Sequence, residues 1–510
     1  MSGTDPAALA VLLARLGGIA DEMGAALQRS ALSPNITERA DCSAAVFDPA
    51  GELVAQAEHI PVHLGAMPLA VRAALDVCAD RVGPGDQIIV NDPYAGGTHL
   101  NDVTLIAPAF TQSGELAGWV ANRAHHADVG GTVPGSMPPD ATHIAEEGFR
   151  VAPTVLTDAV ADEFAAASRT PSERRGDLAA QVGANVVGAG RLLELFPAPF
   201  AEASAYAERR MRVALRGLGE GVSEFGDELD DGSRIRCRVQ LRDGNIEFDF
   251  SGSAAQQRGN TNAVRAVTVS AVAYALRSVV DPTIPASGGA LRPVRVVTEP
   301  GSIVDAVFPA AVAAGNVEVS QRVADVCLGA LAGFAPLRVG AAGQGTMNNV
   351  LLGGRDAGGR PWVYYETIGG GEGGRSDRAG MHGIHTAMTN TRDTPVEALE
   401  RAIPVRVRRY RLRRGSGGAG RWVGGEGIDK EFEMLLPATM TLIAQRRTRR
   451  PFGTAGGDDG AMGEHWLLPA GDPARARRLD GNVTVELAAG DVVRVLTPGG
   501  GGWGPASERA

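Results

Sequence analysis

The histidines of this 510-residue chain are crowded into one stretch, since six of the nine lie within residues 59–143. Two segments of that stretch could do chemistry. The first, NDPYAGGTHLND, is rich in glycine and ends with His99 and Asp102. The second, NRAHHADVGG at 122–131, contributes two adjacent histidines. Imidazole and carboxylate are suitable ligands for zinc, manganese or iron(II), so the segments predict a divalent metal site able to support hydrolysis by activated water.

The adjacent histidines cannot both join such a site easily. Successive side chains of a strand point to opposite faces, so at most one of His125 and His126 is expected among the ligands. The other histidine could transfer protons, or it could hydrogen-bond to a ligand without contacting the metal. The alternative interpretation is that a His-x-x-Asp pair forms an ordinary surface hydrogen bond, with no metal involved.

Other polar residues nearby have plainer interpretations. His59 and His63 are four residues apart, but Pro61 between them argues against a helix that would place both on one face. Both are therefore interpreted as core or turn histidines. Asp41 begins a strand within a charged cluster, where a salt bridge with Arg39 is the simplest expectation.

Outside this region, the signals are weak. His382 and His385 are expected on a helix surface, and His465 in an exposed loop. Lys430, the only lysine, lies in a strand-like segment and is a poor candidate for Schiff-base chemistry. No glycine-rich loop ends in Gly-Lys-Ser/Thr, so ATP is not expected to bind this chain through a Walker A motif.

The elements that position the candidate residues are predicted strands. The segment 86–93 forms a strand that leads into the glycine-rich loop, and 103–110 pairs with 116–124 in a hairpin. The end of that hairpin returns to the same edge as the loop. Two neighbouring strand ends would thus bring the imidazoles and carboxylates together.

The remaining pattern predicts a mixed α/β (α+β), multi-domain fold. An amphipathic helix covers about 6–32, a hairpin follows, and the last third is dense in glycine and rich in strands. The predicted units are an N-terminal domain with the metal site (1–160), a mainly helical segment (161–225), a central α/β domain (226–395) and a strand-rich C-terminal region (396–510).

Composition limits the partners and the compartment. The net charge of −10 argues against nucleic acid, which binds clustered positive charge. No run of about 18 apolar residues indicates a membrane span, and the N-terminus lacks a secretion signal, so a cytoplasmic protein is expected. The four cysteines are far apart in the sequence and are interpreted as buried thiols.

Several segments, in order and across nearly the whole chain, resemble the hydantoinase B/oxoprolinase family. They are ERADCSAAVFD, HIPVHLGAMP, NDPYAGGTHLNDV, NRAHHADVGG, FDFSGSAAQQRGNTN, GNVEVSQRVADVCLGAL and SGGAGRWVGGEG. The family includes N-methylhydantoinase B subunits, the C-terminal half of 5-oxoprolinases, caprolactamase B subunits and the metal-bearing subunits of acetone and acetophenone carboxylases. The motifs are specific for the family but do not separate its members.

The resemblance implies a division of labour. ATP, with magnesium, binds to a partner A subunit, which phosphorylates a carbonyl or enol oxygen. The B subunit holds a divalent metal (Zn, Mn or Fe) and completes the reaction. His126 and Asp128 become candidates for proton transfer or for orienting the ligands. By motif, the metal ligands fall on Asp41, His99, Asp102 and His125.

Three functions follow as hypotheses. The first is the B-type subunit of an ATP-dependent cyclic amidase, a hetero-oligomer that hydrolyses a hydantoin, lactam or 5-oxoproline-like ring. The second is the metal-bearing subunit of an ATP-dependent ketone carboxylase. The third is a non-catalytic subunit that only assembles its partner.

Overall fold

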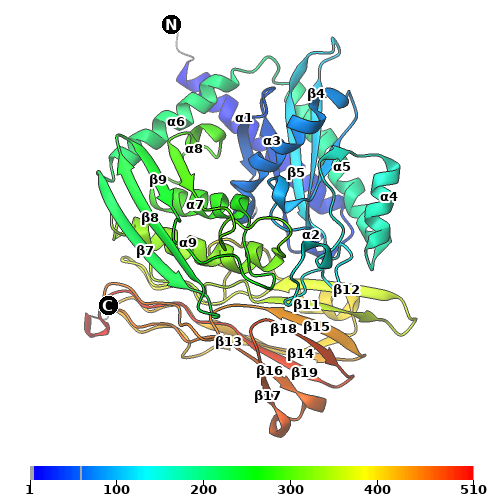
Figure 1. Ribbon diagram of the computed structural model, residues 1–510, viewed down its shortest axis with the longest axis vertical. Coiled ribbons are helices and arrows are strands. Elements are labelled where there is room, and N and C mark those ends of the chain that lie inside the picture. Colours follow the sequence, from blue (N-terminus) through cyan, green and yellow to red (C-terminus); the bar gives the residue numbers. More distant parts are fainter. Residues whose placement is uncertain (1–4, 58–59, 509–510) are drawn as a thin grey trace.

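The computed structural model describes residues 5–57 and 60–508, and the strands of these residues form four sheets. Figure 1 shows helices packed around the sheets of the upper part of the molecule. The mixed α/β, multi-domain class is confirmed, while the four proposed domain boundaries stay predictions. The helices are α1 (Pro6–Ser30), α2 (Pro34–Thr37), α3 (Ala66–Cys78), α4 (Asp158–Ala167), α5 (Pro171–Leu193), α6 (Phe200–Arg216), α7 (Arg265–Val279), α8 (Gly288–Leu291), α9 (Ser320–Leu331) and α10 (Val396–Ala402).

The N-terminal sheet has the strand order β2-β1-β5-β4-β3-β6. Helices cover both of its faces: α1 and α5 pack on one, and α3 packs on the other. Because both faces are buried, the strands are almost continuously apolar, and β1 is buried at every position. Its strands are β1 (Cys42–Phe47), β2 (Leu53–Ala57), β3 (Ile88–Val90), β4 (Asp102–Phe110), β5 (Leu116–His125) and β6 (Thr154–Val155).

Alternation along β1 and β5 sets which side chains meet each covering layer. Val46 and Val120 belong to the core formed with α1 and α5, whereas Phe47 and Ala121 belong to the core formed with α3. The two predicted hairpins are confirmed, since β1 pairs with β2 and β4 with β5, both antiparallel. The face toward α3 is the one that matters for the candidate site.

The central part of the chain packs a second sheet against helices. The sheet has the order β10-β9-β8-β7, and α9 packs on β7 and β8 while also contacting α7. A π-helical turn, η5 (Gly315–Val319), leads directly into α9. The strands are β7 (Gly221–Glu228), β8 (Arg234–Arg242), β9 (Asn245–Asp249) and β10 (Val294–Val297).

The C-terminal third forms two sheets that share a core, at the bottom of Figure 1. One sheet has the order β12-β11-β15-β18 and the other β13-β14-β19-β16-β17. Their strands are β11 (Asn349–Arg355), β12 (Pro361–Thr367), β13 (Val405–Arg413), β14 (Gly427–Met434), β15 (Ala438–Ile443), β16 (Glu464–Leu468), β17 (Arg477–Leu479), β18 (Val483–Leu487) and β19 (Val492–Leu496).

The glycine runs of this third pack backbone against backbone. A Cβ added to Gly500 would lie 2.0 Å from the carbonyl oxygen of Glu372, and one added to Gly371 would lie 2.0 Å from that of Gly425. Side chains cannot fit at such approaches, so the glycines serve close packing and not flexibility.

One stretch, Pro61–Arg81, is long and apolar enough by composition to cross a membrane, which the sequence pattern did not predict. In the fold, 61% of its most apolar window is buried, and α3 within it packs on the N-terminal sheet and on α7. The apolar character of this stretch is accounted for by that packing.

Candidate metal centre

The β4–β5 hairpin places Asp102 and His125 side by side. Asp102 is the first residue of β4, His125 is the last of β5, and the two are paired directly across the ladder. Directly opposed residues of antiparallel strands share one face, so both side chains point to the same side of the sheet. His99 lies in the tight turn before β4, where its carbonyl oxygen accepts a hydrogen bond from the Asp102 amide.

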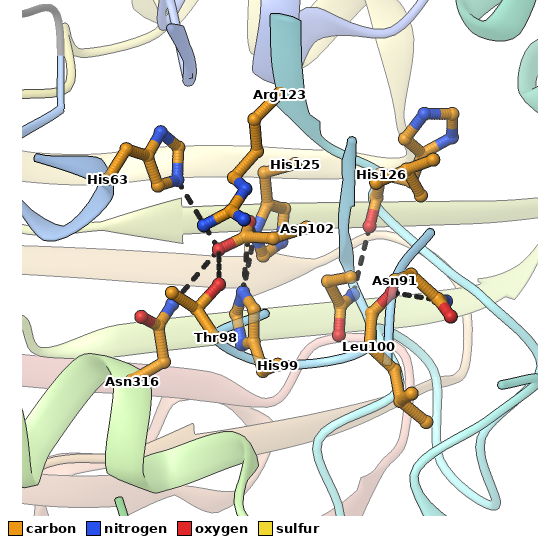
Figure 2. Close-up of polar contacts among 12 residues, drawn as sticks. His63, Asn91, Thr98, His99, Leu100, Asp102, Arg123, His125, His126 and Asn316 are labelled. Carbon is orange, nitrogen blue, oxygen red and sulfur yellow. Dashed lines mark hydrogen bonds and ion pairs between the residues drawn. The ribbon is translucent and has the colours of Figure 1, made fainter. Parts of the chain in front are cut away.

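Three ligand atoms converge at this point (Figure 2). His99 Nε2 lies 3.1 Å from Asp102 Oδ1, His125 Nδ1 lies 3.4 Å from the same oxygen, and the two nitrogens are 3.2 Å apart. Tetrahedral ligands about 2.0–2.1 Å from a zinc ion are about 3.3 Å from one another. The donor set and its spacing therefore fit a divalent metal ion.

The charges of the cluster also suit a cation. Burial lowers the pKa of His99, which favours the neutral imidazole even though Asp102 acts in the opposite direction. For Asp102, burial opposes ionisation, but the neighbouring imidazoles of His99 and His63, together with hydrogen bonds from His125 and His63, hold its pKa well below the usual range. Neutral imidazole and ionised carboxylate are the forms that bind metals.

The second oxygen of Asp102 is held from three other parts of the chain. Oδ2 accepts a short hydrogen bond from the Thr98 hydroxyl, lies 3.3 Å from His63 Nε2 and lies 3.5 Å from Asn316 Nδ2. His63 Nδ1 is in turn 2.9 Å from the Ser43 hydroxyl. These contacts orient the carboxylate so that Oδ1 faces the two imidazoles.

His63 is thus a site residue that the sequence interpretation missed. It lies in a short 3₁₀ turn, η1 (Pro61–His63), and Pro61 begins that turn instead of separating His63 from the site. The only signal in the sequence was its place in the family-like segment HIPVHLGAMP. The prediction for His59 falls outside the described residues.

His126 and Asp128, the predicted proton-transfer residues, lie away from this cluster. The ring of His126 turns to the opposite face (Figure 2), where Nε2 is 2.9 Å from Gln181 Oε1 and the ring meets Phe164 edge-on. Burial, together with the charge of Arg174, lowers the pKa of His126 to about 4. Its catalytic role therefore has no geometric support at this cluster.

Asp128 holds the loop that follows β5 together. Its carboxylate accepts hydrogen bonds from the amides of Gly130, Gly135 and Arg169, and its Oδ2 also lies 2.9 Å from Arg169 Nη1. The Ser168 hydroxyl adds a weaker contact at 3.3 Å. The Asp128 carboxylate already accepts all of these hydrogen bonds. It therefore stabilises the loop and does not reach the three ligands.

Asp41, the predicted fourth ligand, is close to the cluster through its backbone. Its carbonyl oxygen accepts a hydrogen bond from the His125 amide, and its negative charge favours the protonated form of His99. Within the described part of the chain, its carboxylate is not one of the three groups that converge. A role as fourth ligand remains a prediction.

The prediction of a salt bridge between Arg39 and Asp41 is wrong. Arg39 instead donates from Nη2 to the hydroxyls of Thr367, at 2.7 Å, and Thr391, at 3.1 Å. The chain turns sharply at Ala40, which has a φ of 53°, and the two side chains do not pair.

The C-terminal sheets contribute one wall of the site. Tyr365 of β12 stacks on His125 with ring centroids 4.6 Å apart and an interplanar angle of 18°. Its hydroxyl donates to Asn349 Oδ1 at 2.9 Å, and the Arg39 guanidinium carbon lies 5.7 Å from its ring centre. No local pattern in the sequence could link Tyr365 to a histidine 240 residues earlier.

Three further histidines lie in other structural settings than the sequence predicted. His385 lies in a loop, not on a helix, and its ring is almost completely buried. His382, also in a loop, accepts a hydrogen bond from the Glu426 amide. His465 is buried in β16, with Nε2 2.6 Å from Arg447 Nη2, and not exposed in a loop.

A separate cavity of about 410 Å³ is lined in part by Pro61, the first residue of η1. Its walls come from η1, α7, α9 and the loop that contains His385, and they include Pro61, Tyr274, Asp325, Arg338, Glu372 and Thr386. The volume is in the range of small-molecule sites.

The cysteines do not line this cavity. All four are buried free thiols, as expected.

The chain is similar to several proteins of known sequence and structure. The model of the family described as Hydantoinase B/oxoprolinase matches residues 5–506. The chain is 39% identical to 5-oxoprolinase 1 of Arabidopsis thaliana, over 98% of this chain but only 42% of that protein. It is 30% identical to the putative B-type component of a D-/L-hydantoinase from a Pseudomonas strain, over 99% of this chain and 91% of that component.

Solved structures share the whole fold. An ATP-dependent caprolactamase from Pseudomonas jessenii superposes with a TM-score of 0.93 at 27% identity, covering 99% of this chain and 92% of that one. An acetone carboxylase superposes with a TM-score of 0.89 at 18% identity, covering 99% and 76%, and shows likeness of fold alone. From the extent of these matches, the chain belongs to the hydantoinase B/oxoprolinase family.

Proposed function

We propose that this chain is the B-type subunit of an ATP-dependent cyclic amidase. The reaction opens a hydantoin, lactam or 5-oxoproline-like ring after a partner A subunit has phosphorylated the ring carbonyl. The observation that carries the proposal is the buried convergence of His99, Asp102 and His125 at ligand spacing. The family to which the chain belongs and its caprolactamase-like fold support this choice of reaction class.

The chemistry explains why two activities, phosphorylation and hydrolysis, are needed. An unstrained amide is a poor electrophile, and phosphorylation of its oxygen makes the ring carbon reactive. Water adds to that carbon, and a proton moves to the ring nitrogen as the C–N bond breaks. A second water hydrolyses the remaining acyl phosphate to a carboxylate and phosphate. A divalent metal in the cluster supplies Lewis acidity for such hydrolysis.

The residues of this chain hold and enclose the reacting groups. His99, Asp102 and His125 would hold the metal, and His63 fixes the direction of the Asp102 carboxylate. Tyr365 covers the His125 ring and restricts access of bulk water from the C-terminal side. Exclusion of water strengthens every electrostatic interaction within the site.

A separate partner chain fits the coverage of the relatives. The chain spans 42% of the Arabidopsis 5-oxoprolinase but 91% of the Pseudomonas hydantoinase component. We therefore propose that ATP and magnesium bind to an A-type subunit and that the two subunits form a hetero-oligomer.

The test is co-expression of this chain with a hydantoinase A-type protein from the same organism. Purified complex should hydrolyse ATP in the presence of 5-oxoproline, a hydantoin or caprolactam and release the ring-opened product. His99→Ala should abolish product formation while the complex stays intact on gel filtration, with His143→Gln as the surface control. ATP hydrolysis that instead needs a ketone and bicarbonate would favour the carboxylase alternative and contradict the proposal.

A further inference from the structure

The two imidazoles of the candidate metal centre lack the support that ligand histidines usually have. A histidine that binds a metal through one ring nitrogen normally donates a hydrogen bond from the other nitrogen to a carboxylate, a carbonyl or water, and that bond fixes the orientation of the ring. His125 Nε2 and His99 Nδ1 are both buried, and no described residue forms a hydrogen bond with either atom. A different contact must therefore hold each ring in place.

For His125, that contact is Tyr365 of β12. The two rings are nearly parallel, with an angle of 18° between their planes and 4.6 Å between their centroids, as in stacked aromatic pairs. In a closely packed interior, a ring stacked at this distance cannot rotate about its Cβ–Cγ bond without a clash. A half-turn of the His125 ring would replace Nδ1, which lies 3.4 Å from Asp102 Oδ1, by a carbon atom. The stack thus keeps the ligand nitrogen directed at the cluster.

The ring of Tyr365 is itself fixed by its neighbours. Its hydroxyl donates to Asn349 Oδ1 at 2.9 Å. Asn349 Nδ2 donates in turn to Glu318 Oε1, at 2.8 Å, and to the Ile443 carbonyl oxygen, at 2.7 Å. The Arg39 guanidinium carbon lies 5.7 Å from the centre of the tyrosine ring, within the range of a cation–π contact. These contacts leave the ring little freedom to move away from the histidine.

The π-helical turn η5 (Gly315–Val319) approaches the metal centre by two routes. Asn316 Nδ2 lies 3.5 Å from Asp102 Oδ2, so the first route is direct. The second route starts at Glu318, whose carboxylate also accepts hydrogen bonds from two backbone amides, and reaches His125 through the asparagine and tyrosine just described. Single π-helical turns are frequent at functional sites. Here one such turn supports residues that contact two of the three candidate ligands.

We propose that Tyr365 is a positioning residue of the metal centre: its ring sets the orientation of His125 in place of the usual outer hydrogen bond, while Asn349 and Glu318 hold Tyr365. The inference rests on the proposed function only in that a divalent metal binds this cluster. It gives the C-terminal sheets, to which Tyr365 belongs, a part in building a site whose three ligands all lie within residues 99–125.

The neighbouring residue of β12 provides a matched control. Tyr364 is also buried, but its side chain belongs to the core between the two C-terminal sheets, and its hydroxyl donates to Glu366 Oε2 at 2.9 Å. Replacement of either tyrosine by leucine removes a buried ring and should lower the Tm. Because Tyr364 does not touch the ligands, only the loss of Tyr365 should also weaken metal binding.

Competition with a chelator, with zinc as the probe, measures metal binding by the purified full chain without ATP, partner or turnover. Tyr365→Leu should weaken zinc binding by about 10- to 100-fold, the usual effect of losing an outer contact to a ligand. Tyr365→Phe keeps the stack and loses only the bond to Asn349, so it should restore most of the affinity. Tyr364→Leu should bind zinc as the wild type does, even if its Tm falls as far as that of Tyr365→Leu.

Cobalt(II) in place of zinc gives a second readout, because its visible absorption reports the geometry of the ligands. The spectrum of Tyr365→Leu should differ from that of the wild type, and the spectra of Tyr365→Phe and Tyr364→Leu should match it. Wild-type zinc affinity in Tyr365→Leu, or equal losses in Tyr365→Leu and Tyr364→Leu, would overturn the proposal. A complex that shows the expected pattern of metal binding but opens no ring would contradict the proposed function alone, whereas a wild-type chain that binds neither metal would overturn both.

Discussion

Asp102 and His125 face each other at the open end of the β4–β5 hairpin, with Oδ1 3.4 Å from Nδ1. The pairing register alone brings them together, and the preceding turn adds His99. The candidate metal centre is therefore built on a rigid, doubly covered sheet, with only His99 of the three ligands supplied from outside a strand. Such a base suits a site that must keep its ligands at fixed spacing.

Asp102→Asn should remove the metal while preserving the fold. The substitution keeps the shape of the side chain but removes the negative charge that a divalent cation requires. Metal analysis of the purified protein should give less than about a tenth of the wild-type stoichiometry. The control is His126→Gln, because His126 points to Gln181 on the other face and should keep its full metal content. Equal loss in both variants would contradict the assignment of faces.

His63 should act as a positioning residue. His63→Ala deletes the contact with Asp102 Oδ2, which should weaken metal binding by about 10- to 100-fold. His63→Gln, which can still donate to that oxygen, should recover part of the affinity. Competition with a chelator measures the dissociation constants, and exposed His143→Gln provides the control. Wild-type affinity in His63→Ala would exclude this role.

Glu147 should make the protein less stable at alkaline pH. Burial raises its pKa to about 8, against hydrogen bonds from the amides of Val312 and Ala313 that act in the opposite direction. The folded state then holds a proton that the unfolded state has lost, so this stability is present below about pH 4.5 and falls as pH rises toward 8.

Glu147→Gln removes that titration while keeping the shape and an oxygen to accept the amide hydrogen bonds. Relative to the wild type, the variant should gain free energy of unfolding, and with it Tm, steadily between about pH 5 and pH 8, by at most about 1.4 kcal/mol per pH unit. Thermal denaturation at several pH values measures this difference. A difference in Tm that does not change with pH would show that Glu147 is ionised in the folded protein.

Gly500 should not tolerate a side chain. Gly500→Ala would place a methyl group 2.0 Å from the Glu372 carbonyl oxygen, where closely packed backbone leaves no room for it. We expect destabilisation of about 2 kcal/mol or more, by analogy with overpacked cores. Gly17→Ala is the control: it lies in α1 with nothing nearby and should stabilise the helix by up to about 1 kcal/mol. Urea denaturation compares the two.

Local rules predicted the parts of the site that lie within one hairpin. Strand alternation separated His125 from His126, and the hairpin itself followed from the two apolar runs at 103–110 and 116–124. The fold class was predicted in the same way, from composition and spacing.

Residues brought in from distant segments could not be predicted by such rules. Asn316 and Tyr365 reach the site only because the central and C-terminal units pack on the N-terminal sheet, and periodicity carries no information on that packing. His63 was missed because Pro61 was taken as an interruption, whereas it starts the turn that aims His63 at Asp102. The Arg39–Asp41 pair failed because a sharp bend at Ala40 separates neighbours in sequence.

Anomalous X-ray diffraction from crystals of the purified full chain, recorded above and below the absorption edge of the bound metal, tests the central claim most directly. The account predicts one strong peak within bonding distance of His99 Nε2, Asp102 Oδ1 and His125 Nδ1. A protein fully active with its partner whose crystals hold no ion at these atoms, or hold it elsewhere, would contradict the account.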